Sequence, residues 1–252
     1  MQFFTVWNFR KNRHVIFIVL LVFLIALFIL LRPERFLFFF FKEEHVALTK
    51  GNVHENKIAL TFNISWGDEK VHDILAALAN EKIQATFFVS GEWAERHPQI
   101  LEKITDADHE IAMLGYRYKN YVEQEKEQVF KDIVYAKEVF RKLGYEDIEY
   151  IRPPHGKFNE EIIEIANNQG LEVVYWSVNP RDFDNASSEK IAKTVVKETS
   201  GGDIILLHAS DAAQQTADAI QTFVPALNKK DLSFVTMSQL KTAVDSEEKL
   251  LE

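Results

Sequence analysis

The stretch KIALTFNISWGDE, residues 57–69, begins as a buried strand and ends as a polar loop. Its first eight residues are mostly apolar, which is typical of a strand covered on both faces. Asn63 falls at the end of that run. Side chains at the carboxyl ends of parallel strands often carry the chemistry of α/β proteins. Asn63 is therefore either a functional residue or a turn former, and the neighbouring segments decide between the two.

Six more apolar runs follow, and segments with helical periodicity separate them. The sequence predicts strands over 57–64, 85–90, 109–115, 148–154, 171–178, 203–210 and 232–237. It predicts helices near 70–80, 92–104, 124–143, 159–168, 187–198 and 212–228. This alternation indicates a parallel sheet covered by helices. Seven or eight such units in so short a chain predict a small, distorted, TIM-like (β/α)7-8 barrel.

In such a barrel the functional side chains gather at one rim. The candidates at the predicted strand ends are Asn63, Ser90, the 115–120 loop, Arg152, Asn179 and His208. Each also has a structural explanation. Arg152 could be a solvated turn residue, and His208 could be a hydrogen-bonded packing residue.

The N-terminal region contains seventeen consecutive apolar residues, VIFIVLLVFLIALFILL, at 15–31. A helix of that length spans about 25 Å, which fits a thin hydrocarbon core. The basic residues before it favour a cytoplasmic N-terminus, and no small-x-small cleavage site follows it. The expected organisation is a cytoplasmic segment 1–14, a transmembrane anchor 15–31, a linker 32–56, an extracytoplasmic domain 57–240 and a tail 241–252. A cleaved signal peptide and a buried helix are the alternatives.

Composition excludes several classes of function. The 252-residue chain has no cysteine, so disulfides and zinc–thiolate sites are impossible. Its net charge is −9, and residues 1–42 carry six Lys or Arg against one Glu, which leaves about −14 for the remainder. Nucleic-acid binding needs cationic side chains to neutralise phosphates, so an acidic body argues against it.

Four stretches carry a family resemblance by their order and spacing: TFN (61–63), RPPHG (152–156), WSVNPRDF (176–183) and LLHAS (206–210). Together they resemble the polysaccharide deacetylase family, the NodB-homology domains of carbohydrate esterase family 4, over residues 57–240. TFNISWGDE, SGEWAERHP and GYRYKNY look similar to its sporulation subgroup, known as PdaB. The resemblance implies hydrolysis of N-acetyl groups on a peptidoglycan-type glycan by a divalent metal such as zinc, a carboxylate base and a histidine acid.

Several residues depart from the family pattern. Asn63 stands where the family has its carboxylate base, and Ile64 stands where it has a metal-binding aspartate. Leu114 and Tyr118 align with the two histidine ligands. No metal is therefore expected through these positions. An alternative metal site could use Asp68 and His72, four residues apart on a helical turn, together with His208.

The remaining family positions are better kept. The resemblance makes Arg152 the residue that orients the base, and His208 the general acid. Asn179 replaces the aspartate that normally sets the protonation of that histidine. The expected substrate-binding residues are Pro153, His155, Leu206 and Asp182.

Two functions follow from these observations. One is a membrane-anchored deacetylase of cell-wall glycan. The other, which the substituted positions favour, is a catalytically inactive protein of the spore envelope that binds glycan or a partner. The expected partners are cell-wall glycan and, through the N-terminal helix, the membrane, with no nucleic acid. Trp66 and Trp93 could line a sugar groove or pack in the core.

Overall fold

The computed structural model describes residues 13–31 and 46–241, which belong to two separate compact units. In the first unit, α1 covers Arg13–Leu31 and contains the segment predicted as an anchor. Within the two described ranges, no helix is long and apolar enough to cross a membrane. The transmembrane helix predicted over 15–31 is therefore not supported. The predicted segments also extend into 1–12, 32–45 and 242–252, which lie outside the described residues.

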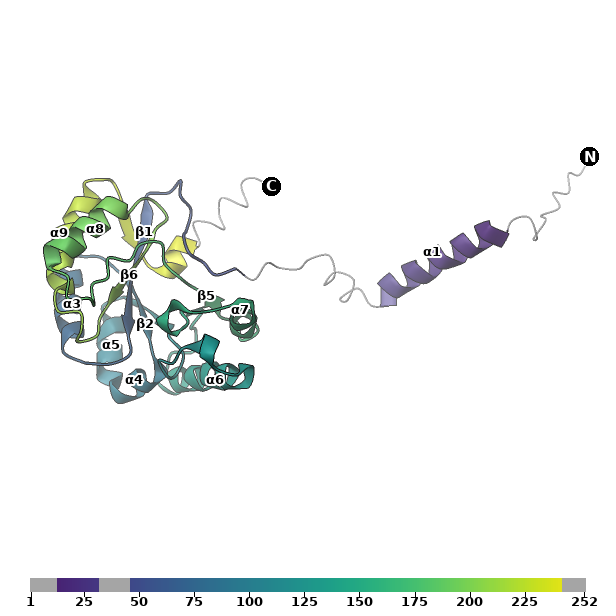
Figure 1. Ribbon diagram of the computed structural model, residues 1–252, viewed down its shortest axis with the longest axis horizontal. Coiled ribbons are helices and arrows are strands. Elements are labelled where there is room, and N and C mark those ends of the chain that lie inside the picture. The colour runs from purple at the N-terminus through teal and green to yellow at the C-terminus, as the bar shows by residue number, and fades with distance from the viewer. Residues whose placement is uncertain (1–12, 32–45, 242–252) are drawn as a thin grey trace, which may run out of the picture. The chain divides into compact units, whose positions relative to one another are not determined.

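The second unit is built on a parallel sheet with the strand order β5-β4-β3-β2-β1-β6, and β7 also pairs with β1 (Figure 1). The strands are β1 Lys57–Ile64, β2 Thr86–Val89, β3 Glu110–Met113, β4 Tyr150–Ile151, β5 Glu172–Val173, β6 Ile204–His208 and β7 Ser233–Val235. Each lies within a run that the sequence predicts as a strand. The predicted parallel α/β architecture is thus confirmed.

The sheet curls into a half-barrel and does not close as the TIM-like prediction requires. β6 pairs with one side of β1, while β2 and β7 share its other side. β5 and β6 are not paired as strands. Among the described residues, three isolated bridges connect the chain near them: Leu48 with Val174, Lys50 with Asp203, and Val178 with Ile205. The predicted strands 148–154 and 171–178 are reduced to two residues each, so too little ladder remains for closure.

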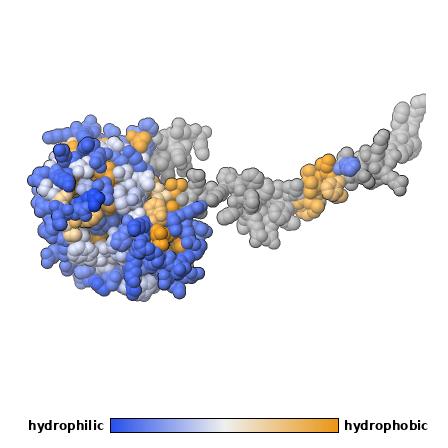
Figure 2. Space-filling model, viewed as in Figure 1, coloured by the Kyte–Doolittle hydropathy of each residue, from blue (hydrophilic) through white to orange (hydrophobic). Residues whose placement is uncertain are grey.

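Helices flank the sheet, and the surface over the described part of this unit is largely hydrophilic (Figures 1 and 2). The helices are α3 Lys70–Glu81, α4 Gly91–Arg96, α5 Pro98–Asp106, α6 Lys126–Lys142, α7 Glu160–Asn167, α8 Ser188–Glu198 and α9 Thr216–Asn228. The single helix predicted over 92–104 is two helices. Proline disfavours helical geometry in the residue before it, so the chain breaks at His97 and Pro98 starts α5.

β1 alternates between the two sides of the sheet. Leu60, Phe62 and Ile64 are fully buried in the core cluster that also contains helix residues. The intervening Thr61 and Asn63 reach the inside of the curl, where both contact Arg152. Successive side chains of a strand point to opposite faces. Asn63 therefore faces the concave side, and Ile64 faces the helices.

Residues before the predicted domain start already pack on the sheet. The backbone N–H of Leu48 donates to the carbonyl of Val173 at 2.8 Å. Lys50 forms an ion pair with Asp203 at 3.0 Å. The described chain joins the domain from residue 46, within the region predicted as a linker.

Candidate active site

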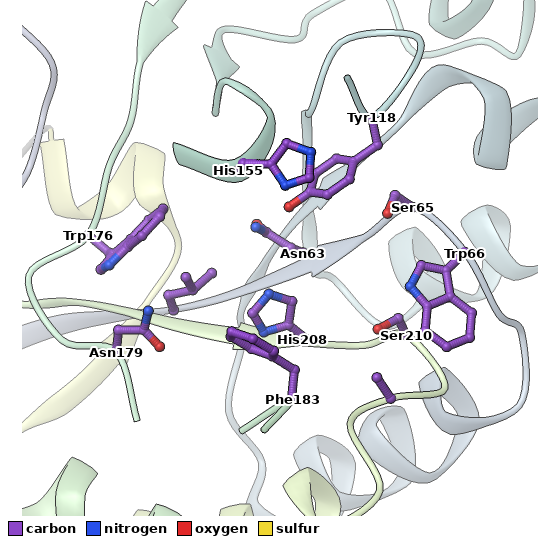
Figure 3. Close-up of a pocket in the computed structure, with 12 residues that line it drawn as sticks. Asn63, Ser65, Trp66, Tyr118, His155, Trp176, Asn179, Phe183, His208 and Ser210 are labelled. Carbon is purple, nitrogen blue, oxygen red and sulfur yellow. The ribbon is translucent and has the colours of Figure 1, made fainter. Parts of the chain in front are cut away.

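A cavity of about 350 Å³ lies at the carboxyl ends of β1 and β6 (Figure 3). It is lined by Asn63, Ser65, Trp66, Tyr118, His155, Trp176, Asn179, Phe183, Leu206, His208, Ser210 and Ala212. Asn63 and His208 are register neighbours on these strands. The structure thus brings together seven residues that the sequence singled out: Asn63, Trp66, Tyr118, His155, Asn179, Leu206 and His208.

Arg152 is fully buried and contacts the cavity through Asn63. Its Nη1 donates to Asn63 Oδ1 at 2.9 Å, and its Nη2 donates to Thr61 Oγ1 and the Tyr175 carbonyl, each at 3.0 Å. The guanidinium carbon lies 3.9 Å from the centre of the Phe88 ring. All the hydrogen-bond acceptors are uncharged. Burial lowers the pKa of Arg152 to about 9, so the guanidinium still carries its charge at neutral pH.

The contact with Arg152 fixes the orientation of the Asn63 amide. A guanidinium has only N–H donors, so the amide oxygen must face it and the amide NH₂ must point elsewhere. Position 63 therefore presents N–H donors on its free side. A deacetylase would present a proton-accepting carboxylate there.

Tyr118 lies beside Asn63 and His155 at one side of the cavity (Figure 3). The rings of Tyr118 and His155 are 4.5 Å apart. Burial raises the pKa of the Tyr118 hydroxyl. The backbone N–H of His155, the charge of Arg152 and the amide of Asn63 act in the opposite direction and only partly offset this effect. The hydroxyl is thus neutral at ordinary pH and able to donate a hydrogen bond.

The residues that the sequence analysis assigned to the family's metal positions do not fit a divalent ion. Ile64 is fully buried in the core cluster on the helix side of the sheet. Leu114 is fully buried in an apolar cluster with Phe88. Neither offers a donor atom, and Tyr118 offers only a neutral hydroxyl. Zinc takes imidazole, thiolate or carboxylate ligands, so this set does not match it.

The alternative metal site is wrong. The Asp68 side chain is 57% exposed and its ionic contact is with His97 at 3.9 Å. His72 is exposed on α3, and neither residue lines the cavity with His208. Among residues 13–31 and 46–241 there is no group of three His, Cys, Asp or Glu placed to hold a metal ion.

His208 is oriented by Asp182, and Asn179 does not contact its ring. The ring Nδ1 lies 2.8 Å from Asp182 Oδ1, and the His208 backbone N–H donates to Asp182 Oδ2 at 2.8 Å. Thr216 Oγ1 also donates to Oδ2 at 2.8 Å. A carboxylate at Nδ1 holds the proton there and leaves Nε2 as the free ring nitrogen.

This geometry corrects two predicted roles. Asp182 is buried and absent from the cavity lining, so it positions His208 and does not bind substrate. Asn179 does line the cavity, and its Oδ1 accepts the backbone N–H of Arg181 at 2.9 Å. Sequence reasoning missed Thr216, because nothing in its surroundings places it next to Asp182.

The RPPHG turn shapes one wall of the site. His155 adopts a left-handed conformation with φ 60°, which is uncommon for a residue with a side chain. Gly156 is also left-handed, and a Cβ there would lie 2.2 Å from Trp176. The turn is therefore tightly packed against that ring. His155 lines the cavity as predicted, but Pro153 is buried and does not.

Aromatic side chains surround the cavity. Trp66 is 54% exposed, and Phe183 is exposed with its ring 4.7 Å from that of His208. Trp176 stacks on Tyr175 at 3.8 Å. Trp93, in contrast, is buried, and its indole N–H donates to the Gly67 carbonyl at 2.7 Å. Of the two tryptophans considered from the sequence, Trp66 lines the cavity and Trp93 packs in the core.

Asp182→Asn should destabilise the domain by about 2 kcal/mol, because the buried site loses charge-assisted hydrogen bonds. The melting temperature should fall by about 4–8 °C. The new amide NH₂ would face Nδ1 of His208 and move the ring proton to Nε2, which ¹⁵N NMR can detect. Asn179→Ala is the control, and we expect no tautomer change in it. An unaltered His208 tautomer in Asp182→Asn would contradict the assigned role.

Comparison with known proteins agrees with this fold. The polysaccharide deacetylase family model matches residues 50–174. A peptidoglycan-N-acetylglucosamine deacetylase of Bacillus cereus is 32% identical over 190 residues, which cover 74% of this chain and 89% of the relative. The peptidoglycan-N-acetylmuramic acid deacetylase PdaA of Bacillus subtilis is 27% identical over 202 residues, covering 79% and 76%. The chain belongs to the polysaccharide deacetylase family.

Solved structures show the same architecture. The Bc1960 peptidoglycan N-acetylglucosamine deacetylase matches with a TM-score of 0.75 and 29% identity, over 78% of this chain and 92% of that one. BA3943 of Bacillus anthracis, described as a CE4 family pseudoenzyme, matches with a TM-score of 0.74. Its identity is 21%, over 78% and 69% of the two chains, so this second likeness concerns the fold alone.

Proposed function

We propose that the domain binds peptidoglycan-type glycan in the cavity and does not deacetylate it. The names of its relatives connect the family to peptidoglycan. The observation that carries the proposal is the Arg152–Asn63 contact, in which an amide replaces the carboxylate that would remove a proton from water. The contact supports the proposal that the protein is a non-catalytic member of the family.

Asn63 cannot act as the base that deacetylation requires. Hydrolysis of an acetamide needs a water molecule that has lost a proton, and a positioned base typically contributes about 10²–10⁴-fold to such a step. An amide cannot take that proton near neutral pH. A metal that lowers the pKa of water could compensate, but Ile64, Leu114 and Tyr118 supply no suitable ligand set.

The walls of the cavity suit a carbohydrate. Exposed aromatic rings offer flat apolar surfaces, and the Asn179, Ser65 and Ser210 side chains offer polar groups at the lining. Ligand sites commonly combine apolar walls with a few polar groups of this kind. These features would remain useful for binding after the loss of catalysis.

Trp66→Ala should reduce retention of the protein on insoluble peptidoglycan by about tenfold, since an aromatic anchor of this size contributes about 1–2 kcal/mol. Co-sedimentation measures this directly. Tyr135→Ala is the matched control, because Tyr135 is 46% exposed on α6 and lies outside the cavity. Equal retention of the two variants would reject glycan binding through this cavity.

A second candidate function is deacetylation, and one observation favours it. The His208–Asp182 pair is complete and is supported by Thr216, as a general acid would require. Release of acetate from N-acetylated peptidoglycan separates the two candidates.

The proposed ligand lies outside the cytoplasmic membrane, so we propose an extracytoplasmic domain that acts during spore formation. The sporulation setting follows from the PdaB-like stretches SGEWAERHP and GYRYKNY. Protease added to intact protoplasts should degrade residues 46–241. Complete protection of the domain until the cells are lysed would place it inside.

A further inference from the structure

The cavity combines two electrostatic features. Its lining contains no Asp or Glu, although the protein as a whole has a net charge of −9. Behind Asn63 lies the buried guanidinium of Arg152, whose hydrogen bonds within the described residues go to the uncharged acceptors of Asn63, Thr61 and Tyr175. Its Nε–H is buried and has no hydrogen-bond partner within the described residues. A buried charge without a counter-ion is costly, and an anion nearby would lower that cost.

A chain of hydrogen-bonding groups leads from this charge into the cavity. Arg152 donates to the Asn63 oxygen, which turns the amide NH₂ away from it. Tyr118 lies at the lining beside Asn63 and His155, and the Asn63 amide and the His155 backbone N–H both lower the pKa of its hydroxyl, the effect of donors near its oxygen. The hydroxyl proton of Tyr118 is then free for another acceptor. Groups arranged in this way polarise one another, which strengthens the last donor.

The nearest buried carboxylate does not cancel this arrangement. Asp182 accepts hydrogen bonds from the His208 backbone, the His208 ring and Thr216. It is absent from the lining, and His208 lies between it and the cavity.

We propose that the cavity binds a small carboxylate group, carried on a glycan as the acid substituent of a sugar, with Tyr118 as its direct donor and Arg152 as its counter-charge. This inference deepens the proposed glycan binding and rests on it for the source of the carboxylate. A site that has lost its own carboxylate at position 63 would thus receive one from its ligand.

The test compares acetate with acetamide, which has the same shape and no charge. Titrations of the full-length protein at constant ionic strength can follow the fluorescence of Trp66 and Trp176, which line the cavity. Acetate should bind with a Kd of about 1 mM, reasonable for so few atoms. Acetamide should bind at least about tenfold more weakly, since charge-assisted hydrogen bonds are about twice as strong as neutral ones.

Substitutions at Asn63 and Tyr118 test how the cavity binds the carboxylate. Asn63→Asp gives Arg152 a counter-ion within the protein, so acetate affinity should fall at least about tenfold. Asn185→Asp is the matched control, because it adds the same charge at an exposed position outside the cavity, and its loss should stay below about threefold. Tyr118→Phe removes the direct donor and should weaken acetate about threefold to tenfold. Equal losses in the two aspartate variants would overturn the proposal.

A competition experiment compares two sugars as displacers of acetate. N-acetylmuramic acid carries a carboxylate, and N-acetylglucosamine does not. The first should displace acetate more strongly than the second, and equal displacement would overturn the proposed source. Retention on peptidoglycan without a preference for acetate would reject this inference and leave the proposed function standing. A preference for acetate without retention would reject the proposed function and leave a carboxylate site.

Discussion

If the domain is non-catalytic as proposed, the full-length protein should release acetate from N-acetylated peptidoglycan at least about 10⁴-fold more slowly than an active relative, because the residues expected at the base and metal positions supply neither a base nor a zinc ligand set. Asn63 has its oxygen against Arg152, and its free side carries only N–H donors. His208 and Asp182 could protonate a leaving amine, but they cannot generate the attacking hydroxide. An enzyme-coupled acetate assay with and without chelator measures the rate. Chelator-sensitive release by the unaltered protein would contradict the prediction.

Asn63→Asp alone should not restore activity, since it supplies a base without a metal. A larger set drawn from the sequence would add Ile64→Asp, Leu114→His and Tyr118→His. The structure removes Ile64 from that set, because its side chain lies in the helix-side core, where a carboxylate would be buried without a partner. Asn63→Asp with Leu114→His and Tyr118→His is the variant to test for metal binding. Acetate release by Asn63→Asp alone would show that metal is not needed.

Asn63→Asp should also stabilise the domain, by about 2 kcal/mol, because an ion pair replaces a hydrogen bond between the charged guanidinium and a neutral amide, at a group that is already buried. For a domain of this size the melting temperature should rise by about 4–8 °C. Asn185→Asp again serves as the control and should leave the melting temperature nearly unchanged. A lower melting temperature for Asn63→Asp would mean that the desolvation penalty of the new carboxylate exceeds the stabilisation by its ion pair with Arg152.

The stabilisation should depend on pH in a defined direction. Burial lowers the pKa of Arg152 from 12.5 to about 9, so the folded state binds this proton more weakly than the unfolded state. The resulting destabilisation is complete below pH 9 and decreases as the pH rises above 9. A carboxylate at position 63 would raise the pKa of Arg152 again, and stability would then no longer change with pH just above pH 9. The advantage of Asn63→Asp should therefore be constant near neutral pH and should shrink above pH 9.

Much of the fold could be predicted from periodicity. The β1 run alternates apolar and polar positions, and six later runs of similar character become strands in the structure. Boundaries between consecutive helices were harder to predict. The single helix predicted over 92–104 divides before Pro98, although the proline is visible in the sequence. Sheet closure depends on how long adjacent strands stay paired, and apolar runs such as 171–178 do not reveal that only two residues pair.

The residues of the candidate site could be predicted in part, but the contacts between them could not. Residue types at the strand ends identified Asn63, Arg152 and His208, because the chemistry of an amide, a guanidinium and an imidazole is known before folding. Which carboxylate meets His208 could not be predicted. Asn179 and Asp182 lie three residues apart in one loop, and Arg181 between them is left-handed with φ 56°. That backbone conformation brings Asp182 under His208 and leaves Asn179 at the lining.

The sequence by itself determined the absence of a base and of metal ligands at the family positions, since Asn63, Ile64, Leu114 and Tyr118 lack the necessary donor atoms whatever the fold. Only the tertiary structure decided what these residues do instead. Asn63 became a donor because Arg152, 89 residues away, accepts no hydrogen bond and forces the amide oxygen toward itself. A hydrogen bond between distant strands depends on the register of the sheet, which no local pattern encodes.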